Sequence, residues 1–440
     1  MVGLIAPLAA AAAAPAAAVT AEAGAADTQS VADALDLAER LVAAGQIEKS
    51  RDMLVSLEGR RTASRAQANQ VQFLLGLLDI ADKDYADAIV RLHRVLVVEP
   101  AAVRVRLELG RAYFLNREYE NAERQFLFAR AGKLPPNVLT NVDRYLIAIR
   151  SLRTFTYNFA FSAASDSNRN AGPATDTVSL YGLPFQLSQS AKASSGVGLA
   201  LDAGLEWAPV VKLPLKWRFG TLLHRAQYRE TAFDDMTVAA YTGPHLTLRR
   251  WDFNLLGTVA RRWYGDRGYL NMAATSADAT YFITTRLGLG AALSSNYFTY
   301  PQNNLQDGWG HNLSVNFFYT PTPASIVRGS ASFGVQGARI AAYASHVQQF
   351  GLAYTRESKG GITIGLSPTY THIDYQAPLA AFNTTRIDHQ FSIQVTLLNR
   401  RIDWDGFTPR VLYTYTRNAS SIPLYTFNRN RVEFGVTRAF

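Results

Sequence analysis

The stretch Gly196–Trp207 reads GVGLALDAGLEW and decides the fold of the larger part of the chain. Every second residue in it is apolar, at Val197, Leu199, Leu201 and Ala203, and the residues between them are small or acidic. Because successive side chains of a β-strand point to opposite faces, this period of two predicts a strand with one apolar and one polar face.

Similar stretches recur from Thr154 to the end of the chain. We predict fourteen strands, the first over residues 154–164 and the last over 430–440. An even number lets a closed antiparallel barrel begin and end on the same side of a membrane. A soluble sheet of this size would need helices to cover its apolar face, and no helical pattern interrupts these strands. The sequence therefore predicts an antiparallel 14-stranded transmembrane β-barrel over residues 154–440.

The connections between the predicted strands alternate in length. Short ones follow even-numbered strands, such as residues 358–360, and longer ones follow most odd-numbered strands, such as 166–192 and 376–383; residues 264–268 are an exception. Barrels of the bacterial outer membrane have short periplasmic turns and longer external loops. This asymmetry predicts an outer-membrane location with both barrel ends, and the N-terminal domain, on the periplasmic side.

Residues 28–153 have a helical pattern that repeats after 34 residues, the period of a tetratricopeptide repeat. Small residues fit where two helices of one unit cross closely, and aromatic ones fill the gap between units. The matching positions are Gly76 with Gly110, Tyr85 with Tyr119, and Ala88 with Ala122. We therefore expect a periplasmic tetratricopeptide-like α-solenoid, which either holds a protein or peptide or only packs on the barrel mouth.

Both ends of the chain carry features of a secreted barrel. Residues 1–23 are apolar and end in Ala21-Glu22-Ala23, which predicts a signal peptide with an A-x-A cleavage site. The last predicted strand is amphipathic and ends in Phe440, as in the signal that barrel-assembly machinery reads. We expect that machinery and the outer-membrane lipid to be partners of the barrel.

Composition excludes several classes of function. The chain has no cysteine, which removes disulfides, thiolate metal sites and cysteine nucleophiles. Its net charge of +9 falls almost wholly after residue 153, but as single residues without the cluster of a nucleic-acid binder. The seven histidines are scattered, and no metal-ligand, nucleotide or nucleophile-elbow motif is present. We predict a non-enzymatic protein without cofactor, metal or nucleic acid.

Aromatic and charged side chains within the predicted strands have expected places. All six tryptophans follow residue 153. Four lie near strand ends and are interpreted as anchors at the membrane interface: Trp207, Trp217, Trp251 and Trp263. A second set is interpreted as facing the lumen, where it either pairs across strands or lines a conduction path: Asp202, Glu206, Arg218 and Arg225.

The segment after the first strand is distinctive. It reads DSNRNA over residues 166–171, DTVSLYGLPF over 176–185 and SSGVG over 194–198. With helical repeats before it and fourteen strands after it, this segment resembles the surface lipoprotein assembly modulators (Slam), the translocons of type XI secretion. Arg169 stands where an apolar residue is expected from the resemblance. Asp166, Asn168 and Asn170 are the candidate client or gate motif, and binding to lumen backbone as a structural plug is the alternative.

The resemblance implies an outer-membrane protein translocon. Its clients would be surface lipoproteins or secreted soluble proteins, many of them binders of host iron, haem or metal carriers, and a periplasmic chaperone is a possible further partner. The competing hypotheses are a tetratricopeptide-containing polysaccharide export porin and a plain diffusion porin, which would not need the repeats. A sugar path would favour many aromatic side chains in the lumen.

Overall fold

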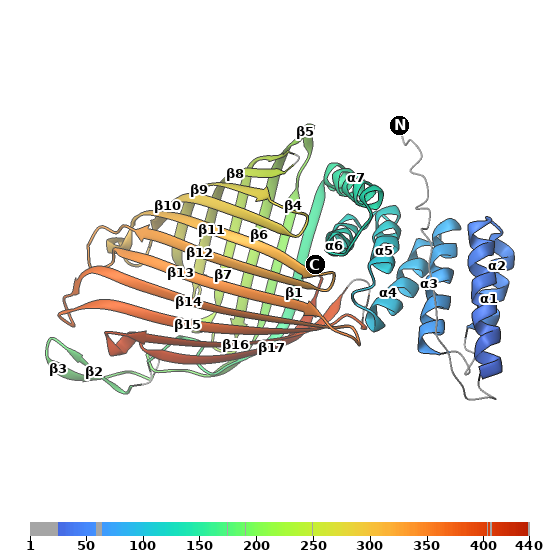
Figure 1. The fold of residues 1–440 in the computed structure, drawn as a ribbon. Helices are drawn as coiled ribbons and strands as arrows, with labels where there is room; N and C mark the ends of the chain where they lie inside the picture. Colours follow the sequence, from blue (N-terminus) through green and yellow to red (C-terminus); the bar gives the residue numbers. More distant parts are fainter. Residues whose placement is uncertain are drawn as a thin grey trace. The chain divides into compact units, whose positions relative to one another are not determined.

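The computed structural model of the chain describes residues 25–58, 64–173, 175–189, 191–248, 250–402, 404 and 407–438. It divides the chain into a helical unit that ends at Arg150 and a strand-rich unit that begins at Ser151 (Figure 1). The predicted signal peptide and Phe440 lie outside the described residues.

Seven helices account for the described part of the N-terminal unit, and successive helices pack against one another from α1 to α6. None of the helices that the structure describes is long and apolar enough to cross a membrane. They are α1 (Ala25–Ala43), α2 (Ile47–Leu57), α3 (Arg65–Ala81), α4 (Tyr85–Val98), α5 (Val103–Leu115), α6 (Tyr119–Arg130) and α7 (Pro136–Leu152).

The helix pairs α3–α4 and α5–α6 are built alike. A Cβ atom at Gly76 would lie 3.0 Å from the Leu92 side chain, and one at Gly110 would lie 3.1 Å from the Phe126 ring, so both glycines permit close crossing of two helices. The turns within the two pairs repeat as well, because Lys83 has φ 68° and the residue 34 positions later has φ 64°. The assignment of these pairs to the tetratricopeptide class stays a prediction.

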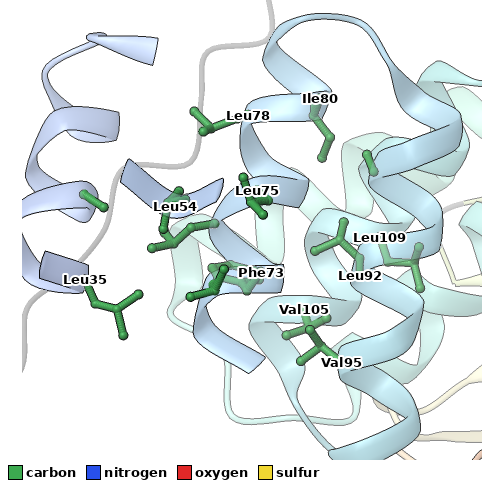
Figure 2. Close-up of a cluster of buried hydrophobic side chains, with 14 of the residues drawn as sticks. Leu35, Leu54, Phe73, Leu75, Leu78, Ile80, Leu92, Val95, Val105 and Leu109 are labelled. Carbon is green, nitrogen blue, oxygen red and sulfur yellow. The ribbon is translucent and has the colours of Figure 1, made fainter. Parts of the chain in front are cut away.

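Two apolar clusters hold the helices together. The first joins α1 to α5 and includes Leu75, Leu92 and Leu109, which Figure 2 shows pointing toward one another from neighbouring helices. The second joins α5, α6 and α7 around Phe126 and Tyr145, whose rings stack at 4.8 Å. The helical unit therefore has its own core.

Fourteen long strands of the described chain form one closed antiparallel sheet, which confirms the predicted barrel. Strand β1 closes it by pairing with both β4 and β17. The strands are β1 (Phe155–Asp166), β4 (Gly196–Trp207), β6 (Leu215–Tyr228), β7 (Asp235–Thr247), β8 (Trp251–Tyr264), β9 (Arg267–Phe282), β10 (Leu287–Thr299), β11 (Gly308–Thr322), β12 (Ser325–Gln336), β13 (Ser345–Glu357), β14 (Ile362–Leu379), β15 (Thr384–Asn399), β16 (Thr408–Ser420) and β17 (Phe427–Thr437).

Three details differ from the expected connections. The first long connection contains a hairpin, β2 (Thr177–Leu180) with β3 (Leu183–Gln186), and a short strand β5 (Val210–Lys212) lies before β6. The connection expected over residues 376–383 is only 380–383, because β14 continues past a register shift and pairs with β15 as far as Leu379.

The alternation of side chains gives the barrel an apolar outer face. Leu199, Leu352 and Phe434 are 50%, 50% and 61% exposed, and each lies opposite a residue of the same face on a neighbouring strand. Such a band of large exposed apolar side chains around a closed sheet is stable only against lipid. The barrel is therefore an outer-membrane barrel.

Candidate functional site

Both carboxylate oxygens of Asp166 are hydrogen-bonded to groups of the protein itself. Asp166 ends β1 and is 1% exposed. Both its oxygens accept hydrogen bonds of 3.0 Å from Nε of Arg429 on β17, and the hydroxyl of Tyr228 on β6 donates to it at 3.3 Å. The backbone N–H of Asn168 donates to Oδ1 at 3.0 Å. Asp166 thus joins β17 and β6, which lie to either side of β1, to the start of the first long connection.

Asn168 and Asn170 form hydrogen bonds at both ends of the connection between β1 and β4. The side-chain amide of Asn168, which is 2% exposed, donates to the carbonyls of Gly172 and Asn428 at 2.8 and 3.1 Å. Asn170 donates to the carbonyl of Lys192 at 2.7 Å and accepts from the N–H of Ser194 at 3.0 Å. The motif therefore brings the outgoing and returning parts of the connection together at the end of the barrel.

Arg169, the departure from the expected pattern, is 8% exposed and joins this connection to the next one. Its guanidinium donates to Glu230 at 2.6 Å and to the hydroxyl of Ser194 at 3.0 Å, and it lies 4.0 Å from the ring centroid of Phe233. Because the polar groups of residues 166–170 find partners within the protein, the geometry favours the structural alternative for the motif over direct contact with a client.

One wall of the lumen is charged and internally paired. Glu206 of β4 accepts from Arg218 at 2.9 Å and from the hydroxyl of Tyr241 at 2.6 Å. On the same wall, Glu433 of β17 accepts from Ser162 at 2.8 Å and pairs with the guanidinium groups of its neighbours. From the sequence, the charged side chains of the lumen either pair across strands or line a conduction path. These contacts support pairing across strands.

Arg225 was expected in the lumen and lies on the opposite face. It pairs in register with Leu201, whereas the next pair along, Asp202 with His224, is joined by a 2.6 Å contact in the lumen. Residues 218 and 225 are an odd number of positions apart on a strand without a bulge, so their side chains point to opposite faces. The prediction for Arg225 was therefore wrong, and Arg225 is outward and exposed.

The other wall of the lumen is polar and uncharged through its middle. From β11 to β16 one register row consists of hydroxyl and amide side chains that neighbour one another across the strands: Ser314, Ser332, Gln349, Thr371, Gln390 and Asn418. The residues two positions away on several strands are also polar, as at Asn312 and Ser392. This wall offers many exchangeable hydrogen bonds and few fixed charges.

The tryptophans and histidines lie largely on the outer face. Trp207, Trp217 and Trp251 are 53%, 39% and 42% exposed, in agreement with their interpretation as interface anchors. Two histidines meet on the outward face of β14 and β15, where the rings of His372 and His389 stack at 4.6 Å. No group of three His, Asp or Glu that could hold a metal occurs within the described ranges.

Comparison with known proteins places these features in a family. Residues 155–440 match the family of surface lipoprotein assembly modifiers. The chain is 22% identical over 375 residues to the surface lipoprotein assembly modifier of Pasteurella multocida (strain Pm70), which covers 80% of this chain and 73% of that protein. It is 24% identical over 376 residues to surface lipoprotein assembly modifier 1 of Neisseria meningitidis serogroup B (strain ATCC BAA-335 / MC58), with 82% and 74% covered.

Solved structures give only a distant likeness. The outer membrane channel DcaP of Acinetobacter baumannii is similar with a TM-score of 0.39 and 9% identity, over 64% of this chain and 97% of that one. A likeness at this distance carries no argument about function.

Proposed function

Because this chain belongs to the surface lipoprotein assembly modifier family, we propose that it assembles lipoproteins on the cell surface as an outer-membrane translocon. Its client, a surface lipoprotein or a secreted soluble protein, passes through the barrel from the periplasm to the outside. The proposal extends to clients that bind host iron, haem or metal carriers. The helical unit receives the client on the periplasmic side, alone or from a chaperone, and the protein carries out no catalysis.

The observation that carries this proposal is the uncharged wall of the lumen. An extended polypeptide exposes one donor and one acceptor per residue, and the row from Ser314 to Gln390 provides both kinds of partner. Since the row contains no fixed charge, it neither traps nor repels client segments of either sign. The charged wall opposite is occupied by its own ion pairs, such as Arg218 with Glu206, and serves to hold the barrel in shape.

The polysaccharide exporter is the second candidate, and the same wall argues against it. A sugar path would present aromatic rings as stacking platforms along the lumen. In β11 to β16 the inward aromatic residues of the described chain are Phe318 and Tyr375, which lie toward opposite ends of the barrel, while the middle row is made of Ser, Thr, Asn and Gln. The wall therefore fits a polypeptide better than a sugar.

Transport needs no nucleotide in this scheme. Folding of the client outside the cell supplies the driving force, because a folded domain cannot return through the lumen. Hydrogen bonding of client strands to barrel strands contributes further to the driving force, as in complexes in which an extended peptide adds a strand to the edge of a sheet.

The test is expression of this protein with its genomic neighbour, as the candidate client, in a host that lacks both. We expect external protease to digest the client in intact cells only when this protein is present. A matched strain carries the barrel with Ser314→Arg and Ser332→Arg, which places charge in the uncharged row and should lower display without lowering barrel levels. A client that becomes protease-accessible equally well without this protein would contradict the proposal and favour the exporter.

A further inference from the structure

A groove of about 770 Å³ crosses the outward face of the barrel. It is lined mainly by outward residues of eight adjacent strands, β1, β4 and β6 to β11, and also by residues at inward positions of these strands, such as Gly220 and Thr258. The lining follows the strand register, in which Leu205 lies opposite Thr221 and Thr221 opposite Ala240. The groove therefore runs across the strands, along the direction of the hydrogen bonds between them.

The groove climbs from one end of the barrel to the other. It begins at Phe155 and Trp207, at the strand ends nearest the N-terminus of the barrel, and finishes at Tyr297 and Trp309, near the opposite ends of β10 and β11. Seven strand spacings of about 4.8 Å give a length of about 34 Å. At a strand tilt of roughly 40° this length rises about 22 Å, close to the apolar band of about 25 Å in such barrels. The groove thus joins the two membrane interfaces.

The middle of the groove is chemically unusual for a surface that faces lipid. It is lined by hydroxyl groups and by residues with little or no side chain: Thr221, Ala240, Thr242, Gly257, Ala273, Thr275 and Ser295. A Cβ atom on Gly257 would meet only the Thr242 carbonyl, at 3.9 Å, so the space above it is open. Outside the groove, on β11 to β13, the outward residues of the middle are large and apolar, for example Leu313, Phe333 and Leu352.

Three of these hydroxyls lack a partner in the described part of the chain. The side chain of Thr242 accepts from the indole N–H of Trp217 at 2.8 Å, whereas the hydroxyls of Thr221, Thr275 and Ser295 have no hydrogen bond to protein there. A hydroxyl that faces hydrocarbon without a partner is costly. The groove therefore suits an apolar ligand that also carries hydrogen-bond acceptors.

We propose that this groove binds the diacylglyceryl anchor of the client lipoprotein, and the proposal rests on the function proposed above. The acyl chains lie in the hydrocarbon, and the ester carbonyls accept hydrogen bonds from Thr221, Thr275 and Ser295. These hydroxyls lie along the groove within the apolar band. The ester carbonyls therefore keep hydrogen-bond donors while the anchor moves from one leaflet to the other.

The place where the groove begins supports a lipoprotein as the occupant. Phe155 is on β1, the strand that closes the barrel. On its side away from β4, β1 pairs with β17, the last strand of the barrel, and this seam closes the sheet. The polypeptide that links the anchor to its domain passes between lumen and membrane at the seam between β1 and β17, beside the lower end of the groove.

The experiment labels the client with a photoactivatable fatty acid that carries an alkyne, in cells that express the full-length protein. After irradiation, we expect the client's fatty acid to be crosslinked to peptides of β6 to β10. Gly257→Leu fills the groove and Thr275→Val removes a hydroxyl at constant shape. Thr275→Val should lower the crosslink and the surface arrival of the lipidated client about tenfold, the effect of losing one hydrogen bond. Gly257→Leu should lower both at least as much, because its side chain occupies the place of the acyl chains. Ala291→Leu, outward on β10 but outside the groove, is the matched control and should change neither.

A client without its acylated cysteine separates this proposal from the function on which it rests. The unlipidated form should reach the surface equally well with the wild-type protein and with all three variants. If the groove variants lower both forms alike, or if label from bilayer phospholipid but not from the client maps to the groove, the anchor site is contradicted and the translocon stands. If both forms reach the surface without this protein, both proposals fail.

Discussion

Replacement of Asp166 by Asn tests how the first external connection is held. The change removes a buried negative charge opposite Arg429, whose side chain is 27% exposed, and weakens the contact with Tyr228. Breaking a buried ion pair costs 3–5 kcal/mol, and the partial exposure of the arginine reduces the cost here to about 2–3 kcal/mol. At 1.4 kcal/mol per tenfold, local opening of the connection should become roughly 30 to 150 times more populated.

Digestion of intact cells by an external protease measures this opening, because cleavage of a fast-opening segment follows its open population. Cleavage within residues 167–195 should accelerate in Asp166→Asn while the barrel itself stays intact. Asp176→Asn is the matched control, since Asp176 belongs to the same connection but is 75% exposed and its pair with Lys192 should contribute at most about 1 kcal/mol. Equal resistance of Asp166→Asn and the wild type, or equal sensitivity of the two variants, would refute the reasoning.

Three further changes have expected outcomes. Deletion of residues 28–150 should leave a barrel that still migrates anomalously in unheated gels but displays less client, because the helical unit has its own core and the barrel is closed by its own strand pairings; loss of the folded barrel would contradict this. Burial raises the pKa of Glu108, so its charged form disfavours the folded helical unit, and Glu108→Gln should raise the Tm at pH 7 by an amount that shrinks toward about pH 4, where the wild-type carboxyl is protonated; a gain independent of pH would argue against this. Deletion of Phe440 should lower assembled barrel levels in membrane fractions without changing export to the periplasm, and unchanged levels would count against a role as assembly signal.

The barrel was predictable because a shift of one residue in a strand exchanges its apolar and polar faces. The first strand was expected over residues 154–164 and is observed as Phe155–Asp166. The hairpin β2–β3 was not found, since strands of four residues within a polar connection carry too little alternation. Its turn is placed by a contact distant in sequence, the 2.7 Å hydrogen bond from the N–H of Tyr181 to the carbonyl of Ala381.

The site was predictable only in part. The sequence identified Asp166, Asn168 and Asn170 as a unit but gave no sign of their partners, because Arg429 and Asn428 lie more than 250 residues away in the chain. The uncharged row of the lumen and the hydroxyl groove could not be recognised, since each is assembled from single residues on many strands. Only the register between those strands brings such residues together.

The most direct measurement of the central claim uses the absence of cysteine from the chain. Single variants Ser314→Cys and Val315→Cys place a thiol at adjacent positions of β11, one facing the lumen and one, 48% exposed, facing outward. A client with one cysteine, stalled in transit by a folded domain fused behind it, should form a disulfide with the lumen variant and not with the outward one. Equal reaction of both, or reaction of neither while the stalled client is exposed outside, would contradict passage of the client through this barrel.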